Sequence, residues 1–132
     1  MSKKPRRRRS AKKPRKNSKR AQHHGHFKHR VRARYELKLT DEHLEEIIGL
    51  IRKKRSESVQ FVGRGKTFIG QGGEEIETFI YLVVFSGKVL PVVYSPQQNW
   101  LSTCFENTGA LLAELPKDRA DSLREWIRER TA

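Results

Sequence analysis

Three side chains between positions 26 and 34 have the types and the spacing that phosphate chemistry needs. His26, Arg30 and Arg34 recur every fourth residue, so a helix would place them along one face. Histidine can transfer protons near neutral pH, and the planar guanidinium of arginine matches the oxygens of a phosphate group. The stripe is therefore a candidate phosphate-binding or catalytic site. The alternative is structural, with Arg30 and Arg34 pairing with carboxylates of the helix that follows.

Four histidines gather in the same segment, at positions 23, 24, 26 and 29. His26 and His29 have a spacing that two metal ligands on a helix can have, but no cysteine or carboxylate lies close to them in the sequence. We therefore predict no metal site and no cofactor. For His26, contact with RNA or proton transfer is the better-supported hypothesis.

The segment GRGKT, residues 63–67, has the look of a phosphate-binding loop. That motif requires a glycine five residues before the second one, and Gln60 occupies the position. We predict instead a basic hairpin turn, whose Arg64 and Lys66 are candidates for contact with nucleic acid.

Two helices are expected to position the stripe. From His26 on, Phe27, Val31 and Tyr35 recur every fourth residue and predict a short amphipathic helix with the stripe at its boundary. A second helix is predicted within residues 39–54, capped at position 40 or 41, with acids in its first turn and cations at its end. Its predicted buried face consists of Leu44, Ile47, Ile48 and Ile51.

After position 56 the periodicity changes to that of strands. Candidate strands cover residues 58–63, 66–70, 76–85, 89–94 and 99–105, with a tight turn at Ser86-Gly87. Pro91 predicts an edge position or a bulge. A terminal helix is expected within residues 116–130, with Leu123, Trp126 and Ile127 on one side. The order is two helices, four or five strands and a C-terminal helix, which predicts an α+β fold with the helices packed on one face of an antiparallel sheet.

The charges divide the chain into two parts. Residues 1–34 carry 16 Lys/Arg and no acid, whereas residues 35–132 carry 13 Lys/Arg and 15 Asp/Glu, so the net charges are +16 and −2. We predict a disordered polybasic tail over residues 1–24 and one domain over 25–132. A polycation gains free energy by releasing counterions from a polyanion, and RNA, DNA or a ribosome is the expected partner. The predicted nucleic-acid-binding residues of the tail are Arg6, Arg7, Arg8, Arg9, Lys12, Lys13, Arg15, Lys16, Lys19 and Arg20.

Other features bound the setting of the protein. The basic segment has no large apolar side chain after Met1 and no apolar run behind it, so we expect neither membrane binding nor a signal peptide, and a cytoplasmic location. Cys104 is the only cysteine and is expected to be buried and inert. The acids Glu42, Glu45 and Glu46 form either a partner surface or a solvated helix face.

Residues 26–106 resemble a known superfamily. The order is "H…R…RY.L.LT", the helix "LEEIIGLIR", an apolar strand and "GKVLPVVYSPQQNWLSTCF". It resembles the small ribonuclease toxins of the barnase, EndoU, colicin and RelE superfamily, in particular uncharacterised, often phage-associated members. The resemblance implies two N-terminal helices packed on a curved antiparallel sheet of about four strands, with an RNA-binding concave surface. It also implies metal-independent RNA cleavage through attack by the ribose 2′-hydroxyl.

The resemblance also implies roles for particular residues. His26 would transfer protons, Arg30 and Arg34 would grip the phosphate, and Tyr94 and Thr103 match positions on the paired strands. The chain departs from the family pattern at Ala33 and Ser95, where a glutamate and an aspartate are usual.

Three hypotheses follow. The first is a ribonuclease with an RNA-binding tail, to which a possible acidic protein partner would bind as a neutraliser. The second is a non-enzymatic protein that binds nucleic acid or the ribosome with the same fold and tail. The third is a phage structural or genome-packaging protein.

Overall fold

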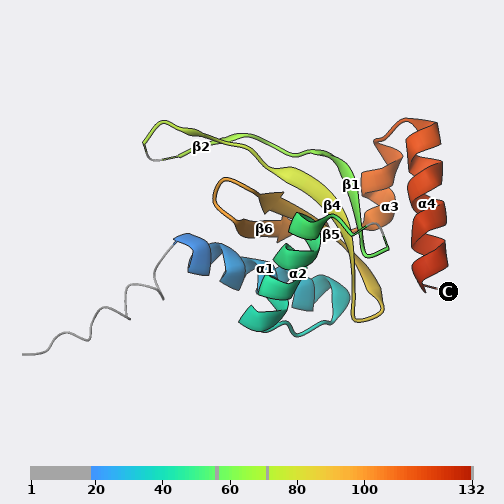
Figure 1. Cartoon of the computed structure of the whole chain (residues 1–132), viewed down its shortest axis with the longest axis horizontal. Helices are drawn as coiled ribbons and strands as arrows, with labels where there is room; N and C mark the ends of the chain where they lie inside the picture. Colours follow the sequence, from blue (N-terminus) through green and yellow to red (C-terminus); the bar gives the residue numbers. More distant parts are fainter. Residues whose placement is uncertain (1–18, 56, 71, 132) are drawn as a thin grey trace, which may run out of the picture.

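The computed structural model describes residues 19–55, 57–70 and 72–131 (Figure 1). The helices are α1 (Lys19–Tyr35), α2 (Asp41–Lys53), α3 (Thr108–Ala113) and α4 (Lys117–Thr131). The strands are β1 (Val59–Arg64), β2 (Phe68–Ile69), β3 (Glu75–Ile76), β4 (Phe79–Phe85), β5 (Lys88–Ser95) and β6 (Trp100–Cys104). This architecture confirms the predicted α+β fold.

Helix α1 includes residues that the sequence assigned to the tail. Phe27 and Val31 are buried as predicted, but the helix already includes Lys19, so the predicted disorder of residues 19–24 is wrong. His24 provides the physical reason, because its side chain is buried and bonded to the sheet. The predicted disorder of residues 1–18, and the tail residues named for nucleic-acid binding up to Lys16, lie outside the described residues.

Helix α2 agrees with its prediction. Thr40 is the N-cap, and its hydroxyl accepts a hydrogen bond from the backbone N–H of His43 at 3.2 Å. The ring of His43 accepts one from the Thr40 N–H at 3.0 Å, so histidine takes the place that glutamate usually has in a capping box. The four predicted apolar residues of α2 are all buried.

The main sheet is antiparallel with the strand order β1-β4-β5-β6. Ser86 and Gly87 join β4 to β5 with φ values of 54° and 77°, the left-handed pair that a tight hairpin requires. Pro91 lies in β5, which pairs on both sides, so the predicted edge position is wrong. The irregularity in the β5–β6 pairing falls between Val93 and Tyr94.

Proline is tolerated in this central strand because another donor replaces its missing N–H. The Pro91 carbonyl accepts from the Phe105 N–H at 2.8 Å. In a regular antiparallel pair the N–H of residue 91 would also donate to the Phe105 carbonyl, but proline has no N–H. That carbonyl accepts instead from the Tyr35 hydroxyl at 2.7 Å. The end of α1 thus completes the pairing of β5.

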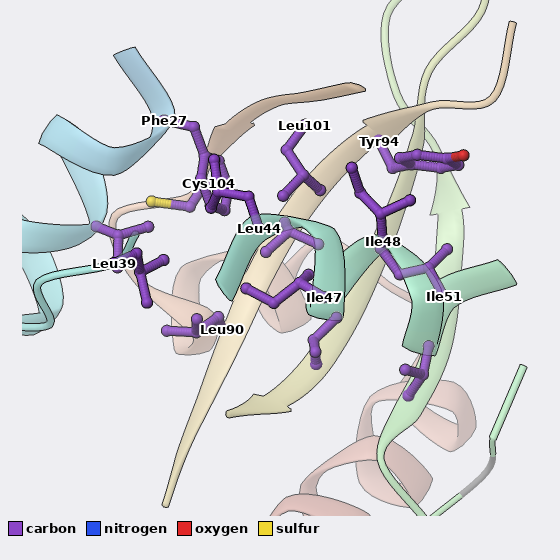
Figure 2. Close-up of a cluster of buried hydrophobic side chains, with 14 residues drawn as sticks. Phe27, Leu39, Leu44, Ile47, Ile48, Ile51, Leu90, Tyr94, Leu101 and Cys104 are labelled. Carbon is purple, nitrogen blue, oxygen red and sulfur yellow. The ribbon is translucent and has the colours of Figure 1, made fainter. Parts of the chain in front are cut away.

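Two apolar cores lie on opposite faces of the sheet. One joins α1 and α2 to side chains such as Val83, Leu90 and Leu101 (Figure 2). The other joins α3 and α4 to Leu82, Val93 and their neighbours. The expectation that the helices pack on one face is therefore right for α1 and α2 and wrong for the C-terminal helix. Residues 108–113 were not predicted as a helix, although Asn107 is its N-cap.

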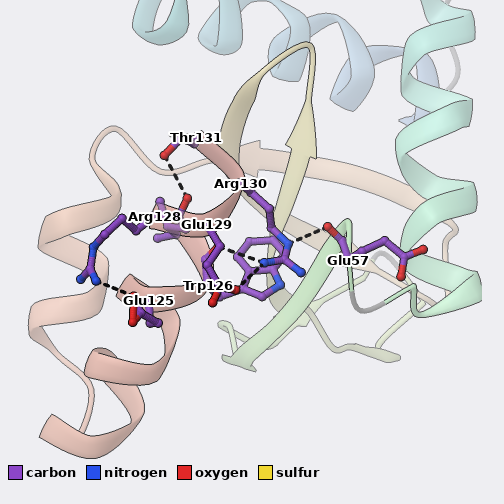
Figure 3. Close-up of polar contacts among 8 residues, drawn as sticks. Glu57, Glu125, Trp126, Arg128, Glu129, Arg130 and Thr131 are labelled. Atoms are coloured by element: carbon purple, nitrogen blue, oxygen red, sulfur yellow. Dashed lines mark hydrogen bonds and ion pairs between the residues drawn. The ribbon is translucent and has the colours of Figure 1, made fainter.

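Polar contacts hold the end of α4 against the segment before β1 (Figure 3). Arg130 donates through Nε to the Glu57 carbonyl at 2.8 Å, and its guanidinium lies 4.6 Å from the centre of the Trp126 ring. Arg119 donates to the Phe61 carbonyl of β1. Helix α4 therefore contacts backbone groups of β1 as well as the core beneath it.

Strands β2 and β3 form a two-stranded arm, residues 65–70 and 72–78, that projects from the body (Figure 1). Its turn uses Gly73, which has a φ of 85°. The predicted turn at GRG is wrong, because residues 63–65 lead directly from β1 into the arm. The Gln97 side chain accepts from the Glu77 N–H at 2.6 Å and donates to the Glu75 carbonyl at 3.0 Å, which braces the arm.

Candidate nucleic-acid interface

Helix α1 covers the free edge of β6. His24 Nε2 accepts from the Leu101 N–H at 3.2 Å, and Arg34 donates to the Cys104 carbonyl at 2.7 Å. Arg20 donates through Nε to the Asn99 carbonyl at 3.0 Å. These bonds satisfy backbone groups that an edge strand would otherwise leave unpaired. Two residues predicted to contact substrate or nucleic acid, Arg34 and Arg20, therefore make structural contacts.

The other two residues of the predicted stripe lie beside Arg34. Arg30 is half-buried. Burial raises the pKa of the nearby Cys104 thiol, and the charges of Arg34 and Arg30 oppose this increase. His26 is exposed rather than half-buried as predicted. Burial, followed by the charge of Arg30, lowers the pKa of His26. The stripe is thus one face of α1, as the spacing predicts.

The carboxylates of α2 pair with different cations from those expected. Arg20 lies 2.8 Å from Glu45, and Lys28 lies 2.7 Å from Asp41. The structural alternative predicted the partner helix correctly, but the cations that pair with its carboxylates are Arg20 and Lys28 rather than Arg30 and Arg34.

Tyr94 and Thr103 lie on opposite faces of the sheet. Tyr94 is 4% exposed and belongs to the core beneath α1 and α2, and its hydroxyl donates to Asn99 Oδ1 at 2.6 Å. Thr103 pairs with Val93, which belongs to the core beneath α3 and α4. The five residues predicted as catalytic are therefore not brought together in one site.

A groove with a different lining opens where α2 ends above the sheet. It has a volume of about 780 Å³, and Tyr94 forms its boundary with the buried core, beside Ile51 (Figure 2). We call it the aromatic groove. Its lining residues are Ile51, Arg52, Lys54, Val59, Phe61, Phe79, Tyr81, Tyr94 and Pro96.

The rings of the aromatic groove contact one another across the strands. Phe61 lies 5.5 Å from Tyr81 and 6.2 Å from Phe79, and Tyr81 lies 6.5 Å from Tyr94. Phe61 pairs with Tyr81 across β1 and β4, so both side chains stand on the α2 side of the sheet, in the part that the helix does not cover. Phe61 is 45% exposed. The groove thus presents aromatic surface to solvent on a rigid sheet.

Cations surround this aromatic surface. Arg52 and Lys54 line the groove at the end of α2, and in the described residues neither pairs with a carboxylate. The Arg64 guanidinium lies 5.7 Å from the centre of the Phe79 ring and also pairs with Glu77. Of the two predicted basic residues here, Arg64 borders the groove and Lys66 is exposed on the arm.

Asn99 connects the groove to the start of α1. Its side chain accepts from the Tyr94 hydroxyl of the groove, and its backbone carbonyl accepts from Arg20 of α1. Burial raises the pKa of both Tyr94 and Tyr81, so these hydroxyls stay protonated at neutral pH. Helix α1 therefore begins close to the aromatic groove.

Sequence reasoning missed this groove. It assigned Phe61, Phe79 and Tyr81 to strands and gave them no role. The available signals were the i, i+2 spacing of Phe79 and Tyr81, which places two rings on one face of a strand, and the cations that follow Phe61 at positions 64 and 66.

Neither a cluster of metal ligands nor a membrane-spanning helix is found in the part of the chain that the structure describes. No group of three or more His, Cys, Asp or Glu side chains that could hold a metal ion occurs in residues 19–55, 57–70 and 72–131. Within the same residues, no helix combines the length and the apolar character that crossing a membrane requires.

Comparison of the chain with protein-family models, curated proteins and solved structures finds no match. The resemblance to ribonuclease toxins therefore stays a prediction.

Proposed function

We propose that this protein binds single-stranded RNA without cleaving it. The observation that carries the proposal is the groove in which Phe61, Phe79 and Tyr81 lie among Arg52, Lys54 and Arg64. Unpaired bases stack on aromatic rings, while cations beside the rings follow the phosphate backbone. Duplexes keep their bases stacked inside, so the groove favours single strands.

The basic segment 1–18 adds affinity that does not depend on sequence. It carries ten Lys/Arg and no acid, and it joins α1 beside the groove. Its cations release counterions from any stretch of backbone, while the groove holds bases. The two together give a tight but weakly selective binder.

Binding is supported better than cleavage by the same geometry. Cleavage by 2′-hydroxyl attack needs a base, an acid and phosphate-binding cations around one phosphate. His26 is exposed on α1, Tyr94 donates to Asn99, and Thr103 lies on the other face of the sheet.

The groove is tested with a labelled single-stranded RNA and fluorescence anisotropy at one fixed salt concentration. We expect Phe61→Ala to weaken binding about 5- to 150-fold, because a stacked base contributes roughly 1–3 kcal/mol. Phe61→Trp keeps a ring and should bind like the wild type. Wild-type affinity in Phe61→Ala would contradict the groove as the binding site.

Charge at the groove has a matched control on α4. Arg52→Ala should weaken binding, whereas Arg124→Ala removes an exposed arginine elsewhere and should not. An equal loss in both variants would mean that net charge, rather than the groove, governs affinity. Single-stranded DNA of the same sequence shows whether the ribose hydroxyl contributes.

Removing residues 1–18 tests the basic segment and leaves α1 whole. We expect weaker binding at low salt and a flatter dependence of affinity on salt, while urea denaturation shows that the domain stays folded. An unchanged salt dependence would exclude the segment from RNA binding.

The cleavage hypothesis is tested with end-labelled RNA in excess chelator. The proposal expects intact RNA that migrates as a complex. Cyclic-phosphate products that disappear in His26→Ala would overturn it in favour of the ribonuclease.

A further inference from the structure

The large apolar side chains that are most exposed lie in two places. Among the described residues they are Phe61 at 45%, Phe68 at 50% and Ile69 at 69%. Phe61 belongs to the aromatic groove, and the other two belong to the arm. Exposed apolar side chains on a projecting element indicate an interaction surface.

The arm holds these two side chains in a fixed arrangement. Phe68 pairs with Ile76 and Ile69 with Glu75 across the two strands. At its base, the Thr78 hydroxyl donates to the Lys66 carbonyl at 2.6 Å, and Gln97 bonds to the β3 backbone. The fold thus presents Phe68 and Ile69 to solvent on a braced hairpin.

The charges of the arm complement those of the groove. The acids Glu74 and Glu75 are exposed beside Ile69, and the cation of the arm, Lys66, lies nearer its base. The groove, in contrast, is lined by Arg52 and Lys54. A nucleic acid would be repelled by two carboxylates beside the apolar pair. The basic, aromatic groove of this chain would instead attract these carboxylates and accept the apolar side chains beside them.

We propose that two copies of this chain pair through their arms, each placing Phe68 and Ile69 in the aromatic groove of the other. Groove and arm are successive parts of one hairpin, and Phe68 lies roughly 20 Å along the strand from Phe61. Two arms that lie antiparallel about a two-fold axis bring both apolar pairs to the opposite groove at once. The interface is therefore self-complementary and closed at the dimer.

The first test measures the mass of the full chain, freed of nucleic acid, by sedimentation velocity over a concentration series. We expect a dimer for the wild type and a monomer for Phe68→Ser/Ile69→Ser. Both side chains are exposed, so the variant should keep the fold, which circular dichroism checks. A wild-type chain that stays monomeric at its highest soluble concentration would overturn the proposal.

A charge exchange tests which surfaces meet. Glu75→Lys and Arg52→Glu should each weaken the dimer, and the double variant should restore it, because each reversed arm then faces a reversed groove. Glu114→Lys changes an exposed acid outside both surfaces and should leave the dimer intact. Two single losses without recovery in the double variant would contradict the arm-to-groove contact.

The arm and RNA then compete for one groove, a consequence that rests on the proposed function. Adding single-stranded RNA to the dimer should produce RNA-bound monomers, and Phe68→Ser/Ile69→Ser should bind RNA more tightly than the wild type. A dimer that binds RNA without dissociating would overturn the placement of the arm in the groove. A dimer that binds no RNA would refute the proposed function and leave the pairing of the chains intact.

Discussion

The sheet face beneath α1 and α2 has two ends, which differ in what their polar and aromatic side chains contact. Along β6, His24, Arg34 and Arg20 of α1 bond to backbone groups at the edge of the sheet. In the aromatic groove, Phe61 is 45% exposed, and neither Arg52 nor Lys54 pairs with a carboxylate of the described residues. Arg34, which was predicted to grip a phosphate, thus bonds to the sheet at one end, whereas strand side chains with no predicted role, such as Phe61, are exposed at the other. Residue type alone therefore does not indicate function in this protein.

The largest expected effect is a difference in stability between substitutions at two phenylalanines, Phe27 and Phe61. Phe27 of α1 is completely buried in the core between the helix and the sheet, and Phe27→Ala should lower the free energy of unfolding by about 3–5 kcal/mol because it leaves a cavity. Phe61→Ala should lower it by about 1 kcal/mol or less, since the ring is already half in water. Urea denaturation of both variants measures the difference. Equal losses would mean that Phe61 belongs to the core rather than to a binding surface.

A second prediction concerns pH and the β6 edge. His24 is 5% exposed and accepts a hydrogen bond, and burial, followed by the charge of Arg20, lowers its pKa to about 4. The unfolded chain takes up the proton near pH 6.5, so the folded state binds fewer protons between pH 6.5 and 4. The contribution of neutral His24 to stability is thus complete above pH 6.5 and decreases as the pH falls towards 4, by up to about 3 kcal/mol.

His24→Gln separates this contribution from those of other titrating groups. Glutamine can accept from the Leu101 N–H and does not titrate, so the variant should lose less stability between pH 6.5 and 4 than the wild type. The measurement is urea denaturation at several pH values. Parallel pH profiles for the two proteins would show that His24 is not the group responsible.

The smallest effect is expected at the junction of α1 with β5 and β6. Tyr35→Phe removes the donor to the Phe105 carbonyl, and we expect a loss of about 1–2 kcal/mol in unfolding free energy. RNA affinity should not change, because Tyr35 lies outside the groove. A variant with unchanged stability would mean that water replaces the hydroxyl at this carbonyl.

The elements of the fold could largely be predicted, because local signals specify them. Helix α2 has its cap and a regular apolar face, and the β4–β5 hairpin has a turn that only certain residues allow. The position of Pro91 could not be predicted, since the donor that replaces its N–H comes from Tyr35, far away in the sequence. The same applies to residues 19–24, where His24 is polar in the sequence and buried in the fold.

The candidate site was predicted only in part. Arg64 was assigned to nucleic acid and does border the groove, and Tyr94 lines it in a role other than the predicted one. Phe61 and Tyr81 were missed because their exposure depends on where α2 ends above the sheet. That position follows from packing between distant segments, which no local pattern encodes.

The bond from Tyr35 to the Phe105 carbonyl also affects how the molecule unfolds. Strand β5 cannot complete its pairing with the end of β6 by itself, because Pro91 has no proton to donate. The missing bond is supplied only when α1 has docked, and the other contacts of α1 secure the rest of the same edge. Undocking of α1 would therefore leave the Phe105 and Cys104 carbonyls and the Leu101 N–H without these partners, so opening of the helix also weakens the strand beside it.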